Sequence, residues 1–306
     1  MPRPLTKVRI GYGLGVRTSL NGDGFGELVD ELERKRFDSL WLSERIGGEA
    51  PDPVSAIAYG AGRTSHLKFG MSVLVLPGRN PIVLAKELAT IDRLSGGRLL
   101  PAFGLGVADP HEQQAFGVAR GERAALFDES LAVLRAAWGP GTFTHHGDRF
   151  EYDDLRVMPK PVQDPLEVWL GGIAPSELRR VGRLADGWLP SFVTPADAAA
   201  GRAVVEQVAA EHDRAIDAGH FGALIPYSMS EVPEVVVAGL AKRRPDLTDP
   251  AALVPIGFDA LVSQVASFVD VGFSKFVVVP LDEPTSTDGW RSHLAEAATA
   301  LLPLQT

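Results

Sequence analysis

The sequence predicts a (β/α)8 TIM barrel with insertions, in which eight parallel strands alternate with helices. Short apolar runs rich in β-branched residues recur along the chain, and each is followed by a turn marked with glycine or proline and then by an amphipathic stretch. Eight such runs over roughly 300 residues are more than one doubly wound sheet usually holds. We therefore expect a single barrel domain over residues 1–306.

The strands are expected at apolar runs short enough to cross a barrel once. Nearly continuous runs such as FVVV at 276–279 suit parallel strands, because those are covered on both faces. The expected strands are residues 8–13, 37–43, 67–75, 98–106, 166–172, 186–192, 221–228 and 274–280.

Amphipathic helices are expected between these strands. In the stretch 81–97, Asn80 supplies a cap, Pro81 suits the first helical position, and Gly96 with Gly97 ends the helix. Other expected helices are residues 26–36, 122–138 and 196–218.

Two segments depart from the strand–helix period. Residues 141–165 are polar, aromatic and rich in proline, and we expect a small hairpin inserted between strands four and five. Residues 229–256 are expected to form the helix after strand seven and a loop that covers the site. Substrate specificity is expected to reside in these two segments, because loops above a rigid barrel are where such folds vary.

Composition restricts the function. The 306 residues are 45% hydrophobic and 23% charged, with a net charge of −9 and no cysteine. The negative charge argues against a nucleic-acid partner, and no stretch approaches the roughly 20 apolar residues of a membrane span. The first residues lack the apolar core of a signal peptide. These features favour a cytoplasmic protein without membrane contact, and the lack of cysteine excludes thiolate catalysis.

Polar residues and glycines gather where the expected strands end, which is where barrels place their sites. The glycine clusters at 11–15 and 104–109 lack the G-x-G-x-x-G spacing of a dinucleotide site, so tight strand-to-loop turns are the favoured interpretation. The stretch LGGIAPSEL at 170–178 is more informative, because free amides at the start of a helix bind anions. An ordinary strand-to-helix turn remains the alternative.

Several motifs in order give the chain a family resemblance. They are SLWLSER, KFGMSVLVLPGRNPIVLAKELATIDRLSGGRL, FGLGVAD, KPVQDPLEVWLGG and RLADGW. With them the chain resembles the bacterial luciferase-like family, in particular its actinobacterial branch that uses the deazaflavin coenzyme F420. The match is strong over residues 8–192 and weaker beyond. The resemblance implies a barrel with a cofactor across its carboxyl end, a homodimer, and hydride transfer to or from a small-molecule substrate.

The resemblance also implies which residues bind the cofactor. A non-proline cis peptide is expected between Ser72 and Val73, where the backbone would meet the cofactor ring; a trans bond with a hydrogen-bonded Ser72 is the alternative. The backbone of Gly171, Gly172 and Ile173 is expected to hold the phosphate side. Further expected cofactor-binding residues are Glu44, Gly106, Val107 and Ala108.

Two residues are expected to act in catalysis. Arg45 stands where the family usually has histidine; arginine keeps its proton, so it would hold a substrate oxyanion or the ionised deazaflavin, unless it only pairs with a carboxylate at the rim. Asp109 would donate a proton if burial raised its pKa, or anchor the substrate. The alternative for Asp109 is a helix cap before PHEQQAFG.

Other side chains are weaker candidates. Arg179, Arg180 and Arg183 could steer an acidic cofactor tail, although such a run is more often a solvated helix face. Aromatic residues at strand ends could form pocket walls or plain core, and they are Tyr12, Trp41, Trp188 and Phe192.

Three other functions remain open from the sequence. An FMN-dependent monooxygenase of the same family would use the same ring site, and a non-catalytic flavin or deazaflavin carrier would explain the missing histidine. A metal-dependent hydrolase is disfavoured because no H-x-H pair falls at a strand end, so we expect no metal. Its candidate ligands would be His66, His111, His145, His146, His212 and His220.

Overall fold

A ring of parallel strands forms the centre of the chain in the computed structural model, which describes residues 7–306. β1 (Arg9–Leu14) pairs with β2 (Ser39–Leu42) on one side and β12 (Lys275–Pro280) on the other. The ring continues from β2 through β3 (Lys68–Met71) with β4 (Leu74–Val75), β5 (Leu99–Leu100) with β6 (Ala102–Gly104), β9 (Trp169–Leu170), β10 (Gly187–Trp188) and β11 (Gly222–Tyr227). Parallel bridges from Trp188 to Phe221 and from Ser191 to Leu224 close it. These positions confirm the eight expected strands and the barrel.

Two of the barrel strands are each interrupted once. In the third strand, β3 pairs with β2 and β5, and β4 pairs with β6. The break between β3 and β4 lies at Ser72 and Val73. The fourth is broken at Pro101, which has no N–H to donate to a neighbouring strand. Both interruptions lie in the half of the barrel formed by the first four strands.

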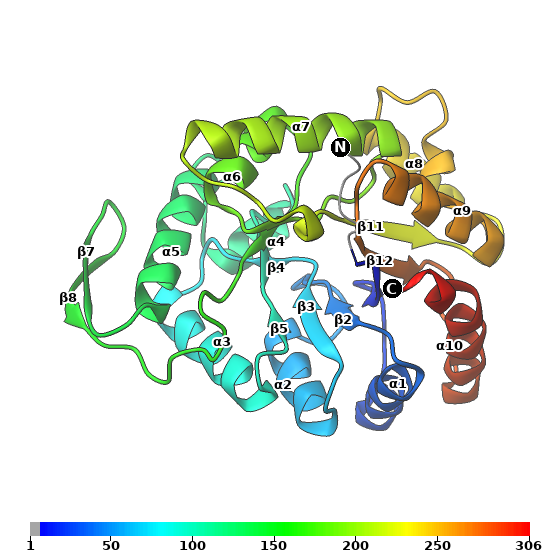
Figure 1. Cartoon of the computed structure of the whole chain (residues 1–306), viewed down its shortest axis with the longest axis horizontal. Helices are drawn as coiled ribbons and strands as arrows, with labels where there is room; N and C mark the ends of the chain where they lie inside the picture. The colour runs from blue at the N-terminus through cyan, green and yellow to red at the C-terminus, as the bar shows by residue number, and fades with distance from the viewer. Residues whose placement is uncertain (1–6) are drawn as a thin grey trace.

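Helices surround the ring on the outside (Figure 1). Asn80 caps α3 as expected, its side chain accepting from the amides of Ile82 and Val83, and Gly96 ends that helix with a left-handed φ of 70°. The barrel helices are α1 (Gly22–Lys35), α2 (Pro53–Arg63), α3 (Pro81–Ser95), α5 (Arg123–Trp138), α6 (Pro175–Leu184), α7 (Pro195–Glu211), α9 (Gly257–Asp270) and α10 (Thr287–Leu301). Additional helices are α4 (Pro110–Phe116), α8 (Glu234–Arg243) and the 3-10 turns η1 (Ala218–His220), η2 (Pro250–Leu253) and η3 (Leu302–Leu304).

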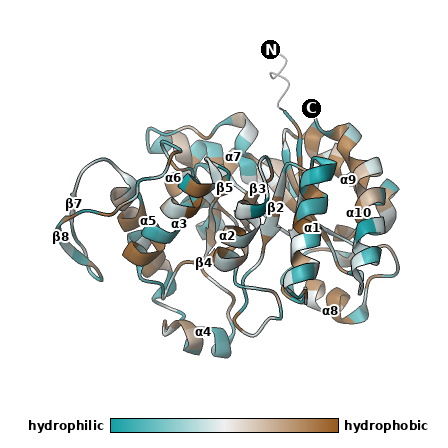
Figure 2. Cartoon of the chain, turned by 90° about the horizontal axis from the view of Figure 1, so that it is seen from below, coloured by the Kyte–Doolittle hydropathy of each residue, from teal (hydrophilic) through white to brown (hydrophobic). Residues whose placement is uncertain are grey.

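Both irregular segments have the expected character. The first contains a hairpin of β7 (Phe143–His146) and β8 (Glu151–Leu155), which projects from the body beside α5 (Figure 1). The second contains α8 and η2. In Figure 2, α4 and α8 lie along the same edge of the molecule. No helix within residues 7–306 has the length and hydrophobicity needed to cross a membrane.

One expected helix is shorter than its sequence suggested. α7 ends at Glu211 rather than continuing to residue 218, because the backbone turns at Asp213, whose φ is 54°. The Arg214 amide then donates back to the Ala209 carbonyl, and the Arg214 side chain donates to the Ala185 carbonyl. These local bonds end a helix that alanine content alone would extend.

Large side chains fill the interior of the barrel. Trp41 and Trp169 are fully buried there with Ala102, Val277 and Val279. Glycines face these rings because a larger residue would collide with them: a Cβ at Gly11 would lie 2.9 Å from Trp41 Nε1. The barrel is therefore a packed core, and any ligand must lie above it.

An ion pair lies inside this core. Lys275 is 3% exposed and its Nζ lies 2.7 Å from Asp38 Oδ2, while Lys68 Nζ lies 3.2 Å from Asp38 Oδ1. Burial favours a neutral Asp38, but attraction to Lys275 and Lys68 outweighs burial and holds the Asp38 pKa well below its usual range. Lys275 and Lys68 begin β12 and β3, so the pair lies at the amino ends of the strands, opposite the candidate site.

Candidate active site

The ends of the second and third strands meet at the mouth of the barrel. The peptide bond between Ser72 and Val73 is cis, as expected. Ser43 Oγ lies 3.2 Å from the Ser72 carbonyl oxygen and 3.3 Å from Ser72 Oγ. The Ser72 amide donates to the Leu42 carbonyl, which keeps the two strands paired up to this point. Two hydroxyl groups and one carbonyl thus gather at the mouth.

The Val73 side chain forms a low shelf between glycines. It packs on the interior cluster of the barrel and remains partly exposed. Gly104 approaches so closely that a Cβ there would lie 2.5 Å from Val73 Cγ2, and a Cβ at Gly171 would lie 3.9 Å from Val73 Cγ1. Because neither neighbour carries a side chain, we infer that the surface at the Val73 side chain is flat and apolar.

Glu44 supports this shelf from below rather than projecting into the mouth. Its side chain is 5% exposed, accepts a 2.7 Å hydrogen bond from the Val75 amide and pairs with Arg79. Burial raises the pKa of the Glu44 carboxyl, and attraction to Arg79 opposes that shift. Both carboxylate oxygens are used by the chain itself, so Glu44 positions the segment that follows the cis bond.

Arg45 lies between two carboxylates at the rim. Its Nε lies 3.5 Å from Glu112 Oε1, and its Nη2 lies 3.9 Å from Asp109 Oδ2. Glu112 also accepts from the Ile46 and Gly47 amides. The arrangement matches the rim ion pair considered from the sequence, and about a third of the Arg45 side chain (35%) stays exposed for other contacts.

Asp109 is the N-terminal cap of α4. It accepts from the His111 amide at 2.8 Å and from the Glu112 amide at 3.4 Å. These hydrogen bonds lower the pKa of the Asp109 carboxyl, with a smaller contribution from Arg45. The condition for proton donation, burial with a raised pKa, is not met, since the side chain is 38% exposed and its ionised form is favoured. The cap alternative describes Asp109, and a role as proton donor loses its support.

An arginine missed by the sequence interpretation fixes the glycine loop after the fourth strand. Arg123 Nη1 donates to the carbonyls of Leu105, Gly106 and Val107 at 3.3, 2.8 and 3.0 Å. Gly106 has a φ of 75°, which favours glycine. Arg123, the first residue of α5, thus fixes the backbone of this loop. The loop contains Gly106, Val107 and Ala108, the three residues expected there to bind the cofactor.

In the loop after the fifth strand, a carboxylate of the chain itself binds the backbone amides. Ile173 and Ala174 both donate their amides to Glu177 Oε2 at 2.9 Å. α6 begins at Pro175, as expected, and Gly172 has a φ of 98°, where a Cβ would meet Glu177. The amides that were expected to be free for a phosphate are therefore occupied by a side chain. Glu177 lies three residues after the N-cap Ala174, where the glutamate of a capping box stands, and this spacing could be read from the sequence even though Ala174 has no side-chain acceptor.

The aromatic residues mostly face away from the mouth. Tyr12 packs outward against Phe37 and Trp290, and its hydroxyl lies 3.1 Å from that of Tyr227. Trp188 also lies in the outer layer and donates to the Gly172 carbonyl at 3.0 Å. Trp41 is fully buried in the barrel interior, with Lys275 Nζ 5.7 Å from its ring centre. Of the four, Phe192, in the loop after β10, fits the expected pocket region.

The arginines of α6 have structural partners. Arg180 Nε lies 2.6 Å from Asp128 Oδ1, and Arg183 Nη2 lies 3.0 Å from Asp128 Oδ2. Arg179 is exposed. The solvated-face alternative fits Arg179, whereas Arg180 and Arg183 instead link α6 to α5.

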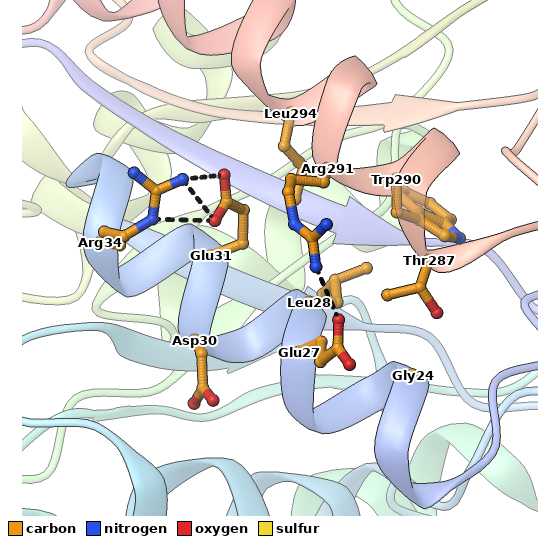
Figure 3. Close-up of a pocket in the computed structure, with 10 residues that line it drawn as sticks. All are labelled: Gly24, Glu27, Leu28, Asp30, Glu31, Arg34, Thr287, Trp290, Arg291 and Leu294. Atoms are coloured by element: carbon orange, nitrogen blue, oxygen red, sulfur yellow. Dashed lines mark hydrogen bonds and ion pairs between the residues drawn. The ribbon is translucent and has the colours of Figure 1, made fainter.

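A cavity of about 270 Å³ lies on the outside of the barrel, between α1 and α10 (Figure 3). Arg291 pairs there with Glu27 at 3.1 Å, and Arg34 pairs with Glu31. Its lining comes from these two helices, and none of the strand-end residues contributes. Within residues 7–306 no group of three His, Asp or Glu side chains is arranged to hold a metal ion.

Comparison with known proteins identifies relatives of much of the chain. Residues 9–268 match the model of the family described as luciferase-like monooxygenase. An F420-dependent glucose-6-phosphate dehydrogenase of Kineococcus radiotolerans is 28% identical over 189 residues, covering 58% of this chain and 55% of the relative. An enzyme of the same name from Amycolatopsis mediterranei is 30% identical over 192 residues, covering 58% and 56%. The matches thus span little more than half the length of these relatives.

Solved structures share the fold over nearly the full chain. An F420-dependent secondary alcohol dehydrogenase, solved with an F420–acetone adduct, superposes with a TM-score of 0.79 at 17% identity, covering 98% of this chain and 100% of that one. The oxygenating constituent of 3,6-diketocamphane monooxygenase from Pseudomonas putida, solved with FMN, gives 0.75 at 16% identity, covering 97% and 98%.

Proposed function

The chain belongs to the luciferase-like monooxygenase family, and from that premise we propose that it is an oxidoreductase that transfers a hydride between the deazaflavin coenzyme F420 and a small organic substrate. The relatives named as F420-dependent support the choice of coenzyme. The single structural observation that carries it is the flat shelf of Val73 between Gly104 and Gly171, because a planar ring needs an apolar surface free of protruding side chains.

The mouth suits the coenzyme in its ring region and less well in its phosphate region. Ser72, Val73 and the loop of Gly106, Val107 and Ala108 offer the ring an apolar surface with backbone groups at its border. Gly171, Gly172 and Ile173 offer a close backbone approach, but Glu177 already accepts from the amides beyond Gly172. A phosphate there would have to share this position with a carboxylate or be attracted by a cation nearby.

The deazaflavin, when bound, supplies a carbon centre that passes two electrons as hydride and reacts poorly with oxygen. The chain's own task is placement and charge stabilisation. Arg45 is positively charged and partly exposed at the rim, so it can stabilise an oxyanion of the substrate. Asp109 and Glu112 hold its guanidinium in place. We propose that residues 229–256 cover the mouth and exclude water when substrate is bound.

A monooxygenase that uses FMN is the second candidate, because the same shelf suits a flavin ring. The FMN-containing structure of similar fold supports this alternative. A non-catalytic carrier would bind the ring without turnover. Titration of the purified protein with coenzyme F420 and with FMN, followed by fluorescence, separates the first two. Turnover with alcohols, sugar phosphates, carbonyls and enones distinguishes an enzyme from a carrier. If the protein bound neither ring, the proposal would be refuted.

We further propose a cytoplasmic homodimer. The lack of cysteine is typical of a reducing compartment. Apolar side chains lie exposed on α2 and α3: Tyr59 at 45%, Val83 at 53% and Leu94 at 81%. A face of this kind favours contact with a second copy. Sedimentation velocity should give twice the mass of the chain, and Val83→Glu combined with Leu94→Glu should halve it; a monomeric wild-type protein would contradict this.

Arg45→Ala is expected to lower kcat by about a hundredfold while the Kd of the cofactor changes by less than about twofold, because the lost charge acts on the substrate and not on the ring. Steady-state kinetics and a fluorescence titration measure the two quantities. Glu112→Gln is the matched control, since it removes the partner of Arg45 without removing the guanidinium. If Glu112→Gln reproduced the full loss of kcat, Arg45 would matter only as part of the rim ion pair.

A further inference from the structure

Arg243 is a cation without a paired carboxylate near the barrel mouth. It ends α8, and its guanidinium carbon lies 4.7 Å from the centre of the Phe192 ring. Among residues 7–306 it forms no ion pair within 4.0 Å. The next residue differs: Arg244 is buried and binds the Phe192 carbonyl at 2.7 Å, Asp197 at 3.0 Å and Asp246 at 2.7 Å. Arg244 fixes the end of the helix, which leaves Arg243 stacked on Phe192 and open to solvent.

The strand pairing places Arg243 beside the loop after the fifth strand. β9 and β10 are parallel neighbours, so Gly171–Ala174 and Leu189–Phe192 leave the sheet side by side. The Trp188 indole ties the two segments by its bond to the Gly172 carbonyl. Phe192, with Arg243 above it, therefore lies next to the loop that Glu177 caps.

Electrostatics link Arg243 to that loop as well. Surrounding protein lowers the pKa of Arg243, and the charge of Glu177 partly offsets this. The Arg243 side chain is exposed and stacked on Phe192, so its guanidinium is accessible to a ligand. A second charge of opposite sign to Glu177 is thus available at the same opening.

We propose that Arg243 is a ligand-binding residue that recognises the phosphate group of the ring-bearing cofactor at the mouth of the barrel. The inference rests on the proposed function and adds a residue that would allow the cofactor phosphate to bind at this end of the site. A phosphate approaching the amides of Ile173 and Ala174 meets the negative charge of Glu177, in a chain whose net charge is −9. A guanidinium overcomes this repulsion and can bind phosphate with two parallel hydrogen bonds. Stacking on Phe192 orients its plane before the ligand arrives.

The test compares each ring with and without its phosphate. FMN and riboflavin differ only in that group, and coenzyme F420 is compared with its phosphate-free deazaflavin core. Arg243→Ala should weaken the phosphate-bearing form by roughly tenfold to thirtyfold and change the phosphate-free form by less than about twofold. Arg243→Lys should give an intermediate loss. Glu177→Gln keeps an acceptor for the loop amides, removes the competing charge, and should tighten only the phosphate-bearing form.

Arg179→Ala is the matched control, because it removes an exposed arginine from α6. Fluorescence titration gives each Kd, and circular dichroism melting checks that every variant folds. Equal weakening of both ring forms by Arg243→Ala would overturn the inference, as would an equal effect of Arg179→Ala, which would indicate a diffuse field. If the wild-type protein bound neither ring form, the proposed function would fail first, and the inference with it.

Discussion

Asp38→Asn is expected to lower the free energy of unfolding by about 3 kcal/mol at neutral pH. The substitution leaves Lys275 buried at 3% exposure without its carboxylate partner, and breaking such a pair from one side typically costs about 3–5 kcal/mol. Urea denaturation followed by circular dichroism measures the change. The double variant Asp38→Asn with Lys275→Met should recover most of the loss, because it removes the unpaired charge as well. A single variant as stable as the wild-type protein would contradict this account.

The pH dependence of that difference follows from the two pKa shifts. The Asp38 pKa is lower in the folded than in the unfolded protein, so its stabilisation is present above the unfolded value of about 3.9 and is lost as pH falls further. The difference between wild type and Asp38→Asn should therefore shrink below about pH 5. Desolvation lowers the Lys275 pKa to about 8, against attraction from Asp38. Burial of that ammonium costs stability at lower pH, and the cost is relieved as pH rises through 8 and beyond.

The strands could be predicted because each barrel strand carries its own local signal. An apolar run and a glycine or proline turn are properties of neighbouring residues, and all eight runs became strands. The Ser72–Val73 geometry came from family resemblance instead. The end of α7 was missed, since the bonds of Arg214 that end the helix depend on where the Ala185 carbonyl lies in the fold.

Side-chain orientation was harder to predict than strand position. Tyr12 was left open between pocket wall and plain core, yet Gly11 and Gly13 flank it in sequence and face the interior, where a Cβ would collide with Trp41 or Val279. Alternation then turns Tyr12 outward. Two glycines spaced by one residue were a signal of a crowded interior, and it was available in the sequence.

Many charged groups, at the site and elsewhere in the barrel, depend on contacts between distant segments. Arg123 contacts a loop that precedes it by about 17 residues, and Asp38 meets Lys275 from the other end of the chain. No spacing rule connects such positions. Glu177 is the exception, because it lies three residues after Ala174 and binds within its own turn. Local helix capping could be predicted from the sequence, whereas ion pairs between distant segments could not.

Gly104→Val is expected to weaken binding of the cofactor ring by roughly a hundredfold. A Cβ at residue 104 would lie 2.5 Å from Val73 Cγ2, so the valine has to displace the Val73 side chain from its present position. The shelf then loses its flat surface, and the displaced side chain stands where the ring would lie. Fluorescence titration with the phosphate-free deazaflavin core isolates this effect from contacts to the phosphate.

Overpacking by itself also destabilises a barrel, so the comparison needs a variant that overpacks elsewhere. Gly60→Ala serves, because a Cβ there would lie 2.7 Å from the Phe69 ring, which belongs to the outer core and not to the interior cluster that Val73 packs on. Both variants should lose about 1–3 kcal/mol of stability, whereas only Gly104→Val should lose ring affinity. Equal affinities in Gly104→Val and wild type would place the ring elsewhere at the mouth. An equal loss in both variants would mean that general loosening of the barrel, and not the Val73 shelf, controls binding.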